Sequence, residues 1–214
     1  MNFHAIMPFH RPIYRPELLD ELIRHFEPMG LVWHPVCEEK ELVVFTEDTH
    51  KWIKPLPCAP LVTPPDQCYR KINDFIEADD IVDDDYYGFI HDDDMYAPGY
   101  IEWVKQQTAK IIICSAHRGM RVSGQDGYPH PTFPLVIRNL NDIRLYNIDL
   151  CQMIVKGEIL RKTRFANAVD YDDAIYADTL RRKWADDILI HPEFGVYFNY
   201  FQPGRYDPDP RFAL

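Results

Sequence analysis

Three consecutive aspartates, Asp92, Asp93 and Asp94, follow a short apolar stretch at residues 86–90. This stretch is typical of a buried β-strand, so the carboxylates are expected at its carboxyl end, where open α/β sheets bind ligands. Crowded carboxylates repel one another unless a cation joins them, and Mg²⁺ or Mn²⁺ suits their oxygen atoms. The triplet therefore predicts a divalent metal site. An acidic turn that caps the next helix stays open as an alternative.

Aspartate clusters elsewhere in the chain show whether such a cluster by itself indicates a metal site. Residues 79–80 and 83–85 are equally dense in aspartate but follow no apolar strand, so we expect them to form a solvated surface turn. A calcium loop of the EF-hand type is disfavoured, because Tyr96, Ala97 and Trp103 stand where it needs an oxygen ligand, glycine and glutamate. Asp172 and Asp173 precede a predicted helix that runs to Trp184, and either aspartate can cap it.

The composition limits the class of protein. The chain has 214 residues, of which 46% are hydrophobic, and this favours one globular domain. A net charge of −11 disfavours nucleic acid as a partner. The longest strongly apolar stretch, at residues 111–114, is too short for a membrane span, so we expect a cytoplasmic protein. The five cysteines lack a C-x-x-C pair and are expected to be reduced and mostly buried.

The predicted elements alternate between strands and helices. A helix that begins at Pro16 carries an apolar stripe that includes Leu22 and Phe26, and a second helix carries Ile72 and Phe75 inward. This strand-helix-strand order favours a parallel sheet. Strands are predicted at residues 2–7, 31–36, 42–45, 86–90, 110–114, 143–148, 151–155, 188–190 and 196–201, and helices at 16–26, 66–76, 98–104 and 172–184.

Taken in order, four segments resemble glycosyltransferases of the GT-A fold, in particular the large inverting, family 2-like group that carries a D-x-D motif. Residues 5–12 (AIMPFHRP) resemble its first strand and proline-containing loop, which touches the nucleotide base. Residues 70–73 (RKIN) resemble a helix ahead of the metal strand, and residues 89–94 (FIHDDD) stand at the place of the D-x-D motif. Residues 171–173 (YDD) resemble the acidic pair where the family places its base.

The resemblance implies a GT-A-like, Rossmann-like α/β fold with a central, mostly parallel sheet flanked by helices. It implies one domain over residues 1–214, with a nucleotide-binding half at 1–114 and an acceptor and catalytic half at 115–214. The implied partners are a nucleotide-sugar donor and a hydroxyl acceptor, with Mn²⁺ or Mg²⁺ as cofactor. The resemblance specifies neither the donor sugar nor the oligomeric state.

The resemblance also implies roles for single residues. Asp92 and Asp94 would hold the metal, and Asp173, with Asp172 beside it, would accept the proton of the attacking hydroxyl in an inverting transfer. Helix capping by Asp173 and solvent exposure of Lys71 and Asn73 stay open as alternatives. The residues implied to bind the nucleotide sugar are Pro8, Phe9, Arg11, Lys71, Asn73, Asp92 and Asp93.

Two other functions stay open. A nucleotidyltransferase of related architecture would need a glycine-rich basic loop near the first strand, whereas residues 7–14 contain no glycine. A non-catalytic GT-A-like domain would keep the fold and bind a partner through its acidic face. Turnover of a nucleotide sugar with Mn²⁺ separates this binding domain from an enzyme.

Overall fold

The computed structural model describes residues 1–9, 16–39, 42, 45, 51–58, 67–78, 80–92, 94–118, 134–145, 147–166 and 172–198. In these residues, eight strands form one sheet in the order β3-β2-β1-β4-β7-β6-β8-β5. The strands are β1 (Phe3–Pro8), β2 (Val32–Glu38), β3 (Leu56–Cys58), β4 (Tyr86–Phe89), β5 (Met95–Tyr96), β6 (Ile111–Arg118), β7 (Met153–Lys156) and β8 (Ile188–Phe198). The α-helices are α1 (Pro16–Phe26), α2 (Gln67–Ala78), α3 (Tyr100–Lys105), α4 (Gly157–Leu160) and α5 (Asp172–Trp184). Single turns of 3-10 helix are η1 (Glu27–Met29), η3 (Leu140–Asp142), η4 (Leu150–Gln152) and η5 (Ala185–Asp187).

The sheet is mixed, with parallel strands on the N-terminal side. The pairs β1–β2, β1–β4 and β2–β3 are parallel, as the predicted strand-helix-strand order requires. β7 lies antiparallel between β4 and β6, and β8 returns parallel to β6. The sheet thus joins the N-terminal and C-terminal parts of the chain into a single domain.

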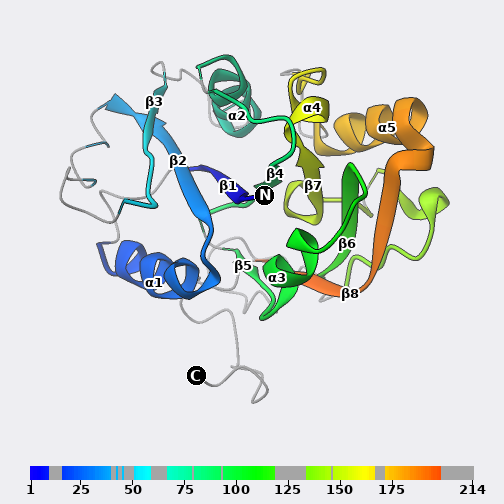
Figure 1. The fold of residues 1–214 in the computed structure, drawn as a ribbon, viewed down its shortest axis with the longest axis horizontal. Helices are drawn as coiled ribbons and strands as arrows, with labels where there is room; N and C mark the ends of the chain where they lie inside the picture. Colours follow the sequence, from blue (N-terminus) through cyan, green and yellow to red (C-terminus); the bar gives the residue numbers. More distant parts are fainter. Residues whose placement is uncertain are drawn as a thin grey trace, which may run out of the picture.

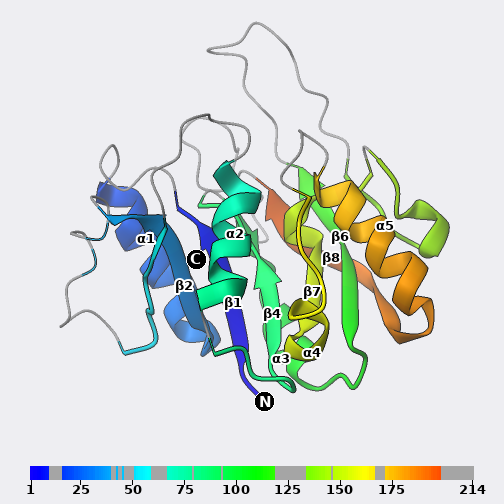
Figure 2. The ribbon, with the colours of Figure 1, turned by 90° about the horizontal axis from the view of Figure 1, so that it is seen from above.

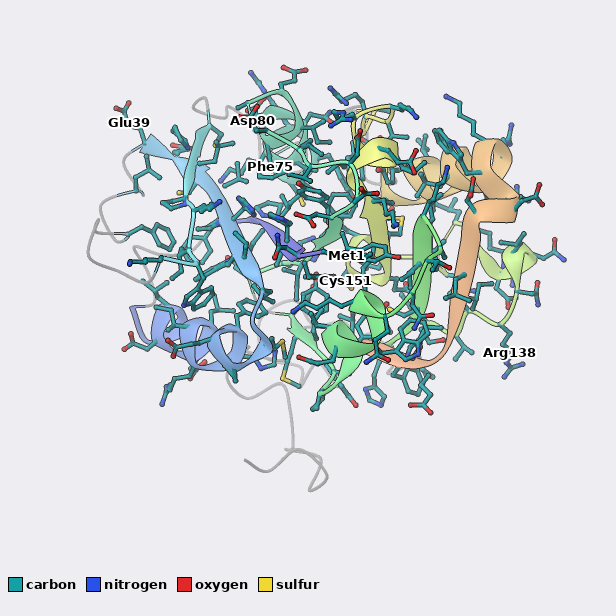
Figure 3. The ribbon with its side chains drawn as sticks, in the orientation of Figure 1. Met1, Glu39, Phe75, Asp80, Arg138 and Cys151 are labelled. Atoms are coloured by element: carbon teal, nitrogen blue, oxygen red, sulfur yellow. The ribbon has the colours of Figure 1, made fainter. Side chains whose placement is uncertain are left out.

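Helices cover both faces of the sheet (Figure 1). α1 and α3 lie on one face, and α2, α4 and α5 lie on the other. Alternate residues of β1 serve the two faces: Phe3, Ala5 and Met7 belong to the core beneath α1 and α3, and Ile6 belongs to the core beneath α2. Phe75 of α2 is fully buried against the sheet, whereas Asp80 lies at the edge of the molecule (Figure 3).

Most predicted elements are confirmed, and three are wrong. Residues 42 and 45 are not in a strand, because Phe45 donates its backbone N–H to the carbonyl of Leu42 (2.9 Å) in a turn. The described residues of 143–148 form turns and coil. The two strands predicted at 188–190 and 196–201 are one strand, β8, whose pairing with β6 shifts register between Ile113 and Ser115.

The carboxyl ends of β1 and β4 lie side by side at one edge of the sheet. In Figure 2 the N-terminus marks the opposite, lower edge, and both strands run upward from there. The ladder continues beyond β4, because Ile90 donates its backbone N–H to the carbonyl of Ile6 (3.1 Å). The aspartate triplet therefore leaves the sheet beside the end of β1. None of the described helices is both long and apolar enough to cross a membrane.

Candidate active site

The two described aspartates of the triplet are buried where β4 leaves the sheet. Asp92 is 1% exposed and Asp94 is fully buried. Neither caps the next helix, which was the open alternative, because the N-cap of α3 is Gly99. Oδ2 of Asp94 accepts a hydrogen bond from the backbone N–H of His91 (3.3 Å). The same oxygen lies 3.0 Å from Nδ1 of the His91 ring. A buried carboxylate without hydrogen-bond partners is costly in free energy. The contacts with His91 therefore stabilise Asp94 in this position.

His91 connects this strand end to the first turn of α2. Its Nε2 lies 3.6 Å from the Sγ of Cys68, while its Nδ1 faces Asp94. Burial lowers the pKa of His91, but the hydrogen bonds and charges of Cys68 and Asp94 outweigh burial and hold it well above its usual value. The imidazole thus places positive charge beside the buried carboxylate of Asp94.

Tyr69, the next residue of α2, reaches the start of α5. Its hydroxyl oxygen accepts a hydrogen bond from the backbone N–H of Asp173. It also interacts electrostatically with Asp173, Cys68 and Asp149. Burial, followed by these charges, raises the pKa of Tyr69, so the hydroxyl stays protonated. The first turn of α2 therefore lies between the acidic end of β4 and the acidic start of α5.

A column of aromatic rings fixes this arrangement. Phe165 stacks on Tyr69 with ring centroids 5.2 Å apart and on Tyr176 of α5 at 4.1 Å. Phe89, the last residue of β4, meets the rings of both Phe165 and Tyr176 edge-on, at 5.4 and 5.9 Å. The hydroxyl of Tyr176 is also 2.8 Å from that of Thr163. These contacts hold β4, α2 and α5 together at the site.

Two residues implied to bind the nucleotide sugar hold the local backbone. The buried Lys71 donates from Nζ to the carbonyl of Phe9 (2.8 Å) and so fixes the chain just after Pro8. Asn73 donates from Nδ2 to the carbonyl of Phe165 (2.9 Å), and its Oδ1 accepts from the backbone N–H of Phe165 (3.0 Å). Neither side chain is solvent-exposed, so that alternative is wrong for both.

Phe9 lies at the end of β1, but its ring faces the core. It is fully buried and meets the rings of Trp33 and Phe45 at 6.1 and 5.5 Å. Its backbone is paired as well, because its N–H donates to the carbonyl of Val36 (2.9 Å) and its carbonyl accepts from Lys71. Arg11 and Asp93 lie outside the described residues.

The structure brings together residues that the sequence does not mark as neighbours. Cys68, Tyr69 and His91 are such residues, and the sequence assigned none of them to the site. The only signal for them is adjacency in sequence: His91 precedes the triplet, and Cys68 and Tyr69 begin the helix that carries Lys71 and Asn73.

A divalent ion at this site would need ligands beyond those of the protein. Among the described residues, no group of three or more His, Cys, Asp or Glu side chains is arranged to hold a metal alone. Mg²⁺ usually takes only one or two protein carboxylates and completes its shell with water and substrate phosphates. Asp92 and Asp94 are the two buried carboxylates near the end of β4 that could supply this smaller number of ligands.

The sequence matches no protein-family model and no curated protein. Solved structures do match in fold. Residues 1–349 of S. aureus TarS, a GT-A glycosyltransferase, are 15% identical with a TM-score of 0.58 over 92% of this chain and 60% of that one. The same TarS segment has been solved with UDP and with UDP-GlcNAc. The inositol-1-phosphate CTP transferase from T. maritima is 8% identical with a TM-score of 0.56 over 97% and 92% of the two chains.

These structures are transferases that share one architecture with this chain, at identities too low to carry a function across. The chain spans about three fifths of the matched TarS structure, at 60% of its length. The fold expected from the order of the sequence segments is confirmed. The protein has a GT-A-like fold, with Asp92 and Asp94 buried where β4 leaves the sheet.

Proposed function

We propose that this protein is a glycosyltransferase that moves a sugar from a nucleotide-sugar donor to a hydroxyl acceptor with inversion. The observation that carries the proposal is the position of the first turn of α2. Through Cys68 it contacts His91 at the end of β4, and through Tyr69 it contacts Asp173 at the start of α5. Two acidic centres about 80 residues apart in the chain thus meet across one helix turn.

Each centre supplies one part of the reaction. A Mn²⁺ or Mg²⁺ ion on the donor diphosphate would be held by Asp92 and Asp94 and would stabilise the negative charge of the leaving group. Asp173 would accept the proton of the acceptor hydroxyl as that oxygen attacks the sugar. Asp173 is partly exposed and lies at the helix start, which is compatible with the approach of an acceptor.

The surrounding residues keep these groups in position. Lys71 holds the backbone at Phe9, where the implied nucleotide loop begins. Asn73 holds Phe165, whose ring lies between Tyr69 and Tyr176. Lys71 and Asn73 therefore serve the site by fixing backbone and aromatic rings in this structure, and the proposal assigns Pro8, Phe9, Arg11 and Asp93 to the donor side.

A second candidate is nucleotidyl transfer, which the T. maritima match favours by covering almost the whole of both chains. The absence of glycine from residues 7–14 argues against it, because binding a nucleoside triphosphate in this architecture requires a glycine-rich loop. A cytoplasmic location is also proposed here, from the reduced cysteines, all five of which are free.

One assay separates the two activities. The protein is incubated with Mn²⁺ and a panel of UDP-, GDP- and CMP-sugars, and release of the free nucleotide is followed in the absence of acceptor as slow hydrolysis. A parallel series with CTP or UTP and sugar phosphates follows pyrophosphate. Nucleotide release that is lost in Asp173→Asn supports glycosyl transfer. Pyrophosphate release without nucleotide-sugar turnover overturns it in favour of nucleotidyl transfer, and inactivity in both series leaves the binding-domain reading in its place.

A further inference from the structure

The carboxyl ends of β6 and β8 lie at the same edge of the sheet as the candidate active site. β7 is antiparallel to both β4 and β6, so β4 and β6 run in the same direction, and β8 is parallel to β6. The three strands therefore end at the upper edge of the sheet in Figure 2. Met95, which follows Asp94, pairs with Tyr197 of β8. The end of β8 thus lies one strand spacing, about 5 Å, from the residue after Asp94.

Three aromatic side chains gather at this end of β6 and β8. The ring centroid of His117 in β6 lies 5.6 Å from that of Phe194 and 5.9 Å from that of Tyr197, both in β8. Phe194 is 37% exposed, and His117 and Tyr197 are half-buried. We call these three residues the β8 platform. Aromatic rings that are exposed together beside a site are typical of a surface that binds a ligand.

The β8 platform faces the side of the sheet on which α2 and α5 lie. Cys114 and Ala116 of β6 belong to the core beneath α1 and α3, and successive side chains of a strand alternate between its two faces. His117 therefore points to the opposite face, where α2 and α5 bring Tyr69 and Asp173 together. The platform and the proposed base thus share one side of the sheet.

His117 also brings a polar atom to this place. Its Nδ1 is buried and has no hydrogen-bond partner in the part of the chain that the structure describes. Buried polar atoms of native proteins almost always have such a partner. An unpaired nitrogen of this kind favours a ligand that carries hydroxyl groups, because a hydroxyl group both donates and accepts hydrogen bonds.

Aromatic rings beside an imidazole fit a saccharide. A pyranose has a flat face of C–H groups, which packs on an aromatic ring, and a rim of hydroxyl groups, which form hydrogen bonds with polar side chains. The strand order indicates which sugar of the reaction this is, because β1 and β8 lie on opposite sides of β4. The platform is therefore on the far side of Asp94 from the proposed nucleotide loop, which follows β1. In an inverting transfer the acceptor approaches from the side opposite the leaving group.

We propose that the β8 platform binds the acceptor and that the acceptor is a saccharide. This proposal rests on the proposed function and names the class of its acceptor. The sugar ring packs on Phe194 and Tyr197, and one of its hydroxyl groups forms a hydrogen bond with Nδ1 of His117. Another hydroxyl oxygen of the same sugar forms the new glycosidic bond. Its proton passes to Asp173, and the nucleoside diphosphate leaves with the electron pair of the bond that breaks.

Binding is tested without nucleotide or metal, so the result does not depend on catalysis. Saturation-transfer NMR detects contact between the protein and the methyl α- and β-glycosides of glucose, galactose, mannose and N-acetylglucosamine. We expect the ring C–H protons of at least one glycoside to receive saturation, with a Kd in the millimolar range. Absence of contact with every glycoside overturns the proposal and leaves the proposed function untouched.

Variants of the platform locate the contact. Phe194→Ala removes the exposed ring and His117→Gln removes the imidazole, and we expect each to weaken binding of the glycoside about threefold or more. Val82→Ala is the matched control, because Val82 is 51% exposed and precedes β4, at the opposite edge of the sheet. Thermal melting identifies the variants that fold. Binding equal to that of the control in either folded variant overturns the platform.

A last arm separates the acceptor from the donor sugar. The UDP-, GDP- and CMP-sugars of the panel above are added with Mn²⁺ to wild-type protein that holds the glycoside. We expect the glycoside signal to persist, because donor and acceptor bind together. Loss of the signal with a nucleotide sugar, but not with the free nucleotide, assigns the platform to the donor sugar and overturns the acceptor assignment. If no nucleotide sugar binds, the acceptor role falls with the proposed function, whereas contact with the glycoside still supports a saccharide site.

Discussion

At the scale of single residues, the neighbouring aspartates at the start of α5 have different environments. Asp172 is 1% exposed, whereas Asp173 is partly exposed and accepts the backbone N–H of Ala174 through Oδ1 (2.7 Å). The attacking hydroxyl has to reach its base, and Asp173 is the more accessible of these two residues. The proposal therefore names Asp173, rather than Asp172, as the proton acceptor.

We expect Asp173→Asn to lower kcat by about 100-fold or more while donor binding and thermal stability stay close to wild type. The amide keeps an acceptor of the same size at the helix start but cannot take a proton. Steady-state kinetics and donor titration measure the two effects. Asp178→Asn is the matched control, because this carboxylate on the same helix is paired with Arg181 and Arg182. If Asp172→Asn loses turnover and Asp173→Asn retains it, the base is Asp172.

The metal prediction concerns Asp94. We expect Mn²⁺ to bind weakly to the protein alone and tightly only together with UDP, since the described residues offer no complete set of ligands. Asp94→Asn keeps an acceptor for the backbone N–H of His91 but removes the charge, so the affinity for Mn²⁺ with UDP should fall about tenfold or more. Calorimetric titration checks this. The exposed Asp84→Asn should bind as wild type does; equal binding by Asp94→Asn would remove the metal assignment.

At the scale of elements, the segment 161–166 determines how α5 meets the sheet. The segment forms no helix or strand. Asn73 of α2 forms hydrogen bonds with the backbone of Phe165, and the hydroxyl of Thr163 forms a hydrogen bond with that of Tyr176 in α5. Both of these residues are buried, so their hydrogen bonds are protected from water. The position of Asp173 thus depends on a helix, α2, that is far from it in sequence.

Removal of the Asn73 side chain should loosen this segment. Asn73→Ala leaves the backbone N–H and carbonyl of Phe165 without their side-chain partner, and we expect a loss of about 1–3 kcal/mol in the free energy of unfolding. Thermal denaturation should show a lower Tm by about 2–4 °C per kcal/mol. Glu77→Ala, on the exposed face of the same helix, should leave the Tm unchanged. A Tm in Asn73→Ala within error of that control would contradict this role.

A buried network crosses the parallel strands at the opposite edge of the sheet. His4 lies 2.9 Å from Nε2 of His34 and 3.3 Å from Asp85, whose carboxylate also accepts the backbone N–H of Asn2 (2.6 Å). Asp85 was predicted to lie in a solvated turn and that prediction is wrong, because it is 5% exposed. Burial, followed by the charges of His4 and Lys54, lowers the pKa of His34 to about 3.

This network makes stability depend on pH. Unfolded His34 takes up a proton below about pH 6.5, while folded His34 remains neutral down to about pH 3. The unfolded state therefore binds more protons in that window, and stability falls as the pH decreases through it, by up to about 1.4 kcal/mol per pH unit from this residue. Urea unfolding between pH 7 and 4.5 should show a shallower loss in His34→Gln. If the free energy of unfolding depends on pH in the same way in both proteins, His34 is not the cause of the loss.

The sequence predicts elements well where an apolar pattern is buried, either on one face of a helix or on both faces of a central strand. The stripe of α1 and the apolar runs of β1, β4 and β6 are confirmed for this reason. The run that begins at Leu42 has the same pattern, but Leu42 and Phe45 pack on the core from a turn. Pro192 and Gly195 predict a break in β8. The strand continues there through a bulge, and Gly195 is needed because a Cβ would lie 2.6 Å from the ring of Tyr100.

The site was only partly predictable for a physical reason. The acidic residues follow a strand or begin a helix, and such local features are visible in sequence. The contacts of Cys68 with His91 and of Asn73 with Phe165 join residues that are distant in the chain, and periodicity carries no information about them. The metal and catalytic roles remain predictions that the variants above test.

At the scale of the whole molecule, the sheet interleaves the two parts of the chain. β4 pairs with β7, and the short β5 pairs with β8, so these two strands from the first half have partners from the second. β6 lies between β7 and β8 and itself crosses residue 114, the boundary predicted between a nucleotide-binding half and an acceptor half. The two halves are therefore not separate structural units, because one hydrogen-bonded sheet contains both. A division between them can only be one of function.

A fragment of residues 1–114 should accordingly fail to fold alone. It would expose the edge of β4 that pairs with β7, and it would leave the truncated β6 without β7 and β8, its two neighbours in the sheet. We expect no cooperative thermal transition and binding of a hydrophobic dye, whereas the full chain should melt in one step. Addition of the separately produced fragment 115–214 should restore part of the cooperative signal, because the missing strand partners return. A fragment 1–114 that melts cooperatively and binds nucleotide alone would show instead that the first half is an independent nucleotide-binding unit.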